Sequence, residues 1–185
     1  MIGLCAGHSR NTTGERLWEW QHCAQVQQRL STILMDCGHQ VVVPPLEYWQ
    51  MDNDTALKNK VRLFNRRQVD LAIEIHVNSG GGKYSTVLYW DKDGKFSPGG
   101  RQLAQCISNQ FASMKRIISS WKAAGPRSQS SMGRNLYFLN ETHMPSVITE
   151  MGFKDAPEQR EFFDSKTGPI VHAELIHLGI EEYIR

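Results

Sequence analysis

The sequence predicts an α/β fold: a single domain with a largely parallel or mixed twisted sheet flanked by helices. Short apolar runs alternate along the chain with helical patterns, which is typical of this class. The length of 185 residues suits one domain, here residues 1–185, and is enough to bury a full core. Hydrophobic residues make up 40% and charged residues 22%, so a disordered chain or a coiled coil is excluded.

The expected strands are β-branched or apolar runs that stop at glycine, proline or polar turn residues. They cover residues 1–5, 41–43, 71–77, 85–90, 136–139 and 147–150. The expected helices carry apolar side chains at helical spacing and cover residues 17–37, 56–64, 103–118 and 162–184, the last interrupted at Gly168-Pro169. Residues 125–133, rich in glycine and serine, are expected to form a flexible loop near the binding groove.

Charge and patterning exclude several classes of protein. The net charge of +2 is too small for general nucleic-acid binding. No apolar run reaches the roughly 18 residues of a membrane-spanning helix, so membrane insertion is not expected. Residues 1–10 lack the basic and apolar regions of a signal peptide, so synthesis in the cytoplasm without a leader is expected. Four scattered cysteines without a CxxC pair suit free thiols in a reducing compartment.

Polar side chains of the right chemistry follow three of the expected strands. His8 comes after the first strand, His76 ends the strand at 71–77, and Glu150 ends the last. In open α/β sheets, ligands bind at the carboxyl ends of the strands, so these residues are expected to converge. Two imidazoles and one carboxylate form the His₂Glu set of a catalytic zinc site.

A second carboxylate is then needed to accept a proton from water. The first helix offers Glu19, or Glu15 one turn earlier, and spacing alone leaves open which carboxylate is ligand and which is base. Taken singly, a histidine at a strand end is more often structural, and Glu19 would be a solvated helix residue. Glu150 lies among apolar residues, where burying an unpaired carboxylate is costly.

Two segments carry a resemblance to a known family. Residues 145–153, Pro-Ser-Val-Ile-Thr-Glu-Met-Gly-Phe, are similar to the signature Pro-(Ala/Ser)-Val-Leu-Val-Glu-x-Gly-Phe of the zinc-dependent N-acetylmuramoyl-L-alanine amidases, the amidase 3 family. Residues 70–78, Asp-Leu-Ala-Ile-Glu-Ile-His-Val-Asn, resemble that family's strand Asp-Leu-x-Ile-Ser-Ile-His-x-Asn. With Gly7-His8, the resemblance spans nearly the whole chain, and it implies the phosphorylase/hydrolase-like fold of that family.

The resemblance implies one zinc ion held by His8, Glu19 and His76, with Glu150 as the catalytic base. In the family the ligand glutamate opens the first helix, and apolar positions follow it seven, eleven, fourteen and fifteen residues on. Counting from Glu19 gives Val26, Leu30, Ile33 and Leu34. Counting from Glu15 gives polar residues at two of these four places, so Glu19 is preferred.

The sequence departs from the family around the first histidine. Cys5-Ala6 stands where the family usually has aspartate and proline, Ser9-Arg10 follows where glycine is usual, and the loop from His8 to Glu19 is short. The shape of this loop is therefore expected to differ. A Cys5 thiolate ligand is an alternative, although a buried strand cysteine is the preferred interpretation.

The resemblance implies hydrolysis of the amide bond between N-acetylmuramic acid and L-alanine in peptidoglycan, as in an endolysin. The alternatives are a zinc metallopeptidase or other amide hydrolase, a wall-binding module whose catalysis has decayed, and a thiol hydrolase that uses Cys5 or Cys106. We expect a monomer that acts on the cell wall after release during phage lysis, or outside the cell if a leader was removed.

Residues 94–140 contain seven basic residues and no acidic one. About half of these are expected on solvated helix faces. The functional interpretation is a cationic surface that faces anionic wall polymers or substrate carboxylates.

Overall fold

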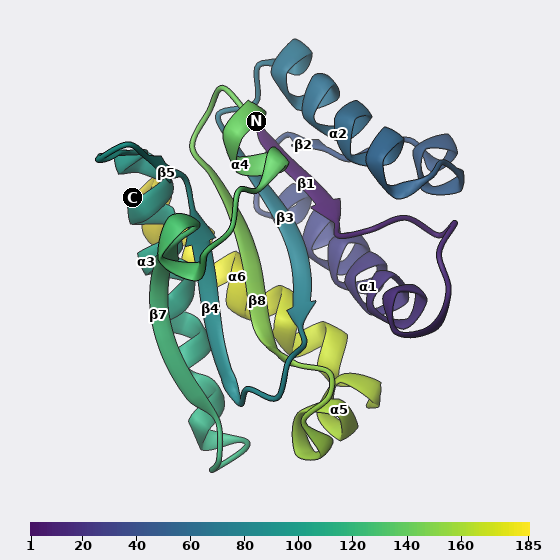
Figure 1. Ribbon diagram of the computed structural model, residues 1–185, viewed down its shortest axis with the longest axis vertical. Coiled ribbons are helices and arrows are strands. Elements are labelled where there is room, and N and C mark those ends of the chain that lie inside the picture. The colour runs from purple at the N-terminus through teal and green to yellow at the C-terminus, as the bar shows by residue number, and fades with distance from the viewer.

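A six-stranded sheet in the order β2-β1-β3-β8-β4-β7 runs through the middle of the computed structural model, which describes residues 1–185 (Figure 1). The strands are β1 (Ile2–Ala6), β2 (Val41–Val42), β3 (Leu71–Asn78), β4 (Tyr84–Tyr89), β7 (Lys122–Ser128) and β8 (Ser146–Phe153). β1, β2, β3 and β8 are parallel to one another. β4 is antiparallel to β8, and β7 is parallel to β4. The predicted α/β class with a largely parallel sheet is confirmed.

Helices cover both faces of this sheet (Figure 1). One face packs against α1 (Gly14–Asp36), α3 (Pro98–Phe111) and α6 (Gly168–Ile184), and the other against α2 (Asn53–Arg67) and α4 (Tyr137–Glu141). The helix α5 (Pro157–Asp164) follows β8. Short elements complete the chain: η1 (Leu46–Gln50), η2 (Ala112–Arg116), η3 (Ser130–Met132) and the small hairpin β5 (Asp91–Lys92) and β6 (Lys95–Phe96). None of the helices combines the length and apolarity needed to cross a bilayer.

Alternation along β3 separates a core face from a functional face. Ile73, Ile75 and Val77 join the larger apolar core, in which the α1 residues of helical spacing are also buried. Ala72 belongs to the smaller core under α2 and α4. Glu74 and His76 share the face of Ala72 because successive side chains of a strand point to opposite sides. The polar end of β3 therefore lies on the α2 and α4 side of the sheet.

The expected strand at residues 136–139 is wrong, because this segment enters the helix α4. Phe138 and Leu139 are buried there, and the ring of Phe138 packs edge-on against Phe64 of α2, with centroids 6.3 Å apart. A short apolar run has the same composition in a buried strand and in a buried helical turn, so periodicity alone could not separate them.

The expected loop at residues 125–133 is also wrong in its first half, because residues up to Ser128 belong to β7. The register between β4 and β7 shifts between Ser85 and Val87, and Gly125 lies opposite this shift with a φ of 72°. The Thr86 hydroxyl donates a hydrogen bond to the Gly125 carbonyl at 2.8 Å. β7 is an edge strand, where glycine at a bulge and a neighbouring proline are tolerated.

Candidate metal centre

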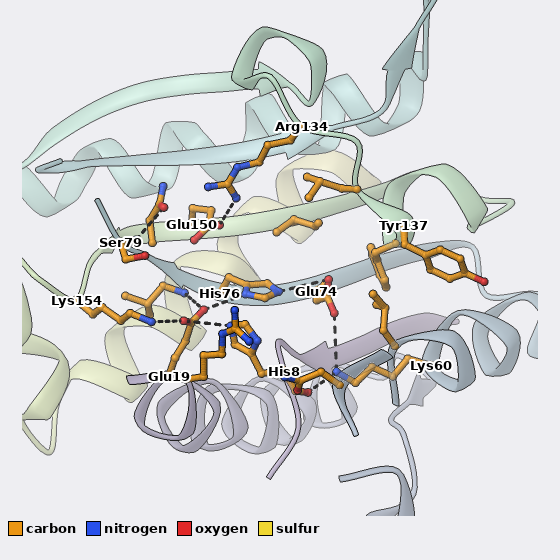
Figure 2. Close-up of a pocket in the computed structure, with 18 of the residues that line it drawn as sticks. His8, Glu19, Lys60, Glu74, His76, Ser79, Arg134, Tyr137, Glu150 and Lys154 are labelled. Carbon is orange, nitrogen blue, oxygen red and sulfur yellow. Dashed lines mark hydrogen bonds and ion pairs between the residues drawn. The ribbon is translucent and has the colours of Figure 1, made fainter. Parts of the chain in front are cut away.

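Three of the predicted side chains converge at the carboxyl ends of β1 and β3 (Figure 2). His8 comes from the loop after β1, Glu19 from the second turn of α1 and His76 from β3, and their ligand atoms all lie within 4.8 Å of one another. Glu19 Oε1 lies 2.9 Å from His76 Nδ1, and Glu19 Oε2 lies 3.3 Å from His8 Nε2. The alternative, Glu15, instead forms an ion pair with Arg160 at 2.9 Å, away from the two histidines.

The backbone before His8 is shaped to admit the ring of His76. A Cβ atom at Gly7 would lie 2.2 Å from Cε1 of His76, so only glycine fits there. His8 itself has a φ of 61°, which non-glycine residues rarely adopt. The Nζ atom of Lys60 donates hydrogen bonds to the carbonyl oxygens of Ala6 at 2.6 Å and His8 at 2.8 Å. These bonds hold the loop in the conformation that presents His8.

Glu19 is the most tightly held of the three side chains. It is 3% exposed, and Oε1 also accepts the Val77 N–H at 3.2 Å, while Oε2 accepts from Lys154 Nζ at 2.8 Å. Burial alone would raise the pKa of Glu19, but the hydrogen bonds with His76 and His8 hold it well below its ordinary value. The carboxylate is therefore ionised and ready to bind a cation.

Two carboxylates, those of Glu19 and Glu74, flank the ring of His76 and favour positive charge there. Its Nε2 atom lies 3.4 Å from Oε2 of Glu74, opposite the nitrogen that faces Glu19. Burial lowers the pKa of His76, but the two carboxylates outweigh it and raise the pKa to about 10. Two imidazoles and a carboxylate are ligands that zinc prefers, so this preformed donor set fits a zinc ion.

Glu150 lies beside this centre, because it is the register partner of His76 on β8. Glu150 is 5% exposed, and its Oε2 atom is buried without a hydrogen-bond partner. Its Oε1 atom lies 3.7 Å from Arg134 Nη1. Burial raises the pKa of Glu150 to about 7. A carboxyl group with a pKa near neutrality and a free oxygen suits a general base.

A cavity of about 360 Å³ joins these four residues (Figure 2). Other charged residues that line it are Arg16, Asp54, Lys60, Glu74, Arg134 and Lys154. Sequence reasoning missed them as members of the site, although Arg134 was counted in the basic region. Glu74 carried the same signal as Glu150, a carboxylate within an apolar strand. Nothing in the sequence pattern indicated that Lys60 and Lys154 would reach the site from distant segments.

Asn78, which also lines the cavity, forms no hydrogen bond with His76. Its side-chain oxygen accepts the backbone N–H of Ser79 at 2.9 Å, and its carbonyl accepts the Lys154 N–H. These hydrogen bonds are those of a residue that shapes the turn after β3.

The cysteines named in the competing hypotheses lie outside the metal centre. Cys5 is fully buried with Sγ 3.8 Å from the Ile73 carbonyl, and burial raises its pKa well above the ordinary value. Burial also raises the pKa of Cys106. Neither thiol forms a hydrogen bond with a histidine. Cys37 Sγ lies 3.6 Å from His177 Nε2, at the C-terminal end of α1.

The seven basic residues of the region 94–140 lie on several different elements. Lys95 lies on β6 and Arg101 on α3, and two more lie on β7. Arg134 alone among them lines the cavity. The region therefore divides into one residue at the site and several on the surrounding surface.

Solved structures of other proteins share the fold of this chain. The chain resembles the CwlD amidase of Clostridioides difficile, solved in complex with the GerS lipoprotein, with a TM-score of 0.79 and 18% identity over 99% of this chain and 97% of that one. It also resembles the catalytic domain of the CD27L endolysin, which targets Clostridia difficile, with a TM-score of 0.75 and 24% identity over 98% and 96%. These likenesses establish the fold.

The sequence profile of the N-acetylmuramoyl-L-alanine amidases, the amidase 3 family, matches residues 2–182, and the chain belongs to this family. An uncharacterized cell wall amidase of Bacillus anthracis is 29% identical over 134 residues, which are 69% of this chain and 24% of that protein. The uncharacterized protein YqiI of Bacillus subtilis is 26% identical over 96% of this chain and 80% of its own length. The chain thus spans about a quarter of the first relative and most of the second.

Proposed function

We propose that this protein is a zinc-dependent hydrolase that cleaves the amide bond between N-acetylmuramic acid and L-alanine in peptidoglycan. The observation that carries the proposal is the convergence of His8, Glu19 and His76 within 4.8 Å of one another, beside a carboxylate with an unpartnered oxygen. Membership of the amidase 3 family supports the choice of substrate.

His8, Glu19 and His76 would hold the zinc ion through two imidazole nitrogens and one carboxylate oxygen. When bound, zinc supplies Lewis-acid polarisation of a carbonyl and lowers the pKa of water toward about 7. Lys154 and the Val77 N–H keep the Glu19 carboxylate oriented toward the two rings. Gly7, just before His8, leaves room for the ring of His76, because a Cβ atom at this position would overlap the ring.

Glu150 would accept a proton from the attacking water and pass it to the leaving amine. A pKa of about 7 suits both steps near neutral pH, since the group can gain and lose a proton there. Arg134 opposes the effect of burial, because its cation near Oε1 favours the charged form of Glu150. Its Oε2 atom has no hydrogen-bond partner in the protein, so the carboxylate is not committed to a structural hydrogen bond through that oxygen.

The cavity offers cations for a peptide that carries carboxylates. Arg16, Arg134 and Lys154 line it, together with the candidate ligands. Positive charge at the edge of a cleft raises the local concentration of anionic substrate. We therefore propose that the peptide of the substrate, rather than its sugar, lies against these side chains.

The chain would act as a monomer. It would reach the wall from outside the membrane, either after release at phage lysis or as an exported protein. The basic residues of the region 94–140 that lie outside the cavity would contact anionic wall polymer.

Mass spectrometry of peptidoglycan fragments, after digestion with and without a chelator, tests this proposal. The expected products are free L-alanine amino termini and glycan with an intact lactyl group, lost on chelation and restored by added zinc. Cleavage of a peptide or glycosidic bond instead would contradict the substrate. Activity that resists the chelator but is blocked by iodoacetamide would favour a thiol hydrolase.

A further inference from the structure

We propose that Glu74, supported by Lys60, is a positioning residue that fixes the imidazole of His76 for metal binding. This inference rests on the proposed zinc site and extends it to a second layer of residues. Glu74 precedes His76 by two residues on β3, so both side chains lie on the same face of the sheet. Figure 2 shows Glu74 between His76 and Lys60.

The two ring nitrogens of His76 face two different carboxylates. Nδ1 lies 2.9 Å from Glu19, a candidate ligand, and Nε2 lies 3.4 Å from Oε2 of Glu74. A histidine that binds a metal through one nitrogen usually donates its other N–H to a carboxylate or carbonyl, which fixes the tautomer and the ring orientation. The geometry therefore assigns Nδ1 to the metal and the Nε2 proton to Glu74.

Lys60 compensates the buried charge of Glu74. Glu74 is 5% exposed and Lys60 is 1% exposed, and Lys60 Nζ lies 3.8 Å from Glu74 Oε1. An uncompensated carboxylate at this depth would be costly to bury. The same ammonium binds the His8 carbonyl at 2.8 Å, so one lysine connects the supports of both histidines.

This carboxylate distinguishes the chain from the strand pattern that it otherwise resembles. The pattern Asp-Leu-x-Ile-Ser-Ile-His-x-Asn has serine where this chain has Glu74. A serine hydroxyl is shorter and neutral, so it cannot provide the same charged acceptor. The substitution Glu74→Ser therefore measures what the carboxylate adds.

The test compares zinc affinity, by competition with a chromophoric chelator, for the wild type, Glu74→Gln, Glu74→Ser and the matched control Glu15→Gln. Glu15 is also a carboxylate of the same region, but it pairs with Arg160 and touches neither histidine. We expect Glu74→Gln and Glu74→Ser to weaken zinc binding about 10- to 100-fold. Glu15→Gln should bind zinc as the wild type does.

NMR of the His76 ring in the zinc-loaded protein gives a second readout, which a merely structural role of Glu74 would not move. In Glu74→Gln we expect the ¹⁵N chemical shifts of the ring to change and the Nε2 proton to exchange faster with solvent.

Unchanged zinc affinity and unchanged His76 shifts in the folded variants would overturn the inference. That outcome differs from a failure of the proposed function, in which the wild type itself would neither bind zinc nor cleave peptidoglycan.

Discussion

His76 and Glu150 are register partners on the neighbouring parallel strands β3 and β8. Register partners on adjacent strands place their side chains on the same face of a sheet, so the imidazole and the carboxylate both border the cavity. The two residues nevertheless differ in their contacts. His76 is held by carboxylates on both ring nitrogens, whereas Glu150 keeps one oxygen without a partner. This difference matches the roles proposed for them, with His76 as a metal ligand and Glu150 as the base.

The isosteric substitution Glu150→Gln should leave zinc bound and abolish cleavage. Glu150 is not one of the three converging ligands, so the metal content should stay at that of the wild type. Loss of a general base typically costs 10²- to 10⁴-fold in rate, which we expect here as an order of magnitude. Metal analysis and hydrolysis of a soluble muropeptide measure the two effects. A variant that digested cell walls at the normal rate would show that the assigned role is wrong.

Gly7→Ala should disrupt zinc binding although alanine is a small residue. The added methyl would lie 2.2 Å from the His76 ring, so the imidazole must leave its position. Gly38→Ala is the matched control, because no atom lies within 4 Å of the new Cβ and only its φ of 90° opposes the change. We expect the control to lose about 1 kcal/mol of stability and to keep its zinc affinity. Equal zinc affinity in the two variants would refute the argument from close approach.

Acidification should destabilise the protein through the buried histidine pair His22 and His172, which does not line the cavity. His22 Nε2 lies 3.2 Å from His172 Nδ1 between α1 and α6. Burial lowers the pKa of His22 to about 4 and lowers the pKa of His172 well below its ordinary value. Below about pH 6.5 the unfolded chain binds protons that the folded chain excludes, so stability falls as the pH drops from about 6.5 to 4. For His22 alone the loss reaches about 3 kcal/mol at pH 4.

Urea unfolding of the wild type and His172→Phe at several pH values, with chelator present throughout, measures this effect. We expect the stability of the variant to fall less steeply below pH 6.5. Parallel curves would show that the histidine pair does not titrate as its burial implies.

High salt should slow lysis of intact walls more than cleavage of a small soluble muropeptide. The field of a surface charge extends about 8 Å at physiological salt and about 3 Å at 1 M. High salt therefore weakens the attraction between the protein surface and a charged polymer before it affects contacts inside the cavity. The basic residues of the region 94–140 that lie outside the cavity are the proposed source of this attraction. Equal slowing of both substrates would remove the proposed contact with anionic polymer.

The residues at the strand ends were predictable because the sheet is mostly parallel. His8 follows β1, and His76 lies within β3. Glu150 lies within β8, which continues for three more residues than expected. Glu19 was preferred to Glu15 because the apolar positions along α1 match the spacing of the amidase 3 family when counted from Glu19, and the structure brings Glu19, not Glu15, to the two histidines. These predictions depended on strand order and on the resemblance to the family.

The remaining features depend on contacts between distant segments. Lys60 reaches Glu74 from α2, and Lys154 reaches Glu19 across 135 residues of sequence. No local pattern records such pairs. The segment at residues 136–139 was misinterpreted for a related reason, because Phe138 is helical only in a context that includes its partner on α2.

A crystal structure grown with ample zinc, with anomalous diffraction data collected at the zinc edge, tests the central claim most directly. The account predicts one anomalous peak about 2.0 to 2.2 Å from a nitrogen of His8, a nitrogen of His76 and a carboxylate oxygen of Glu19. No peak at that position, or donors too far apart to share one ion, would contradict it.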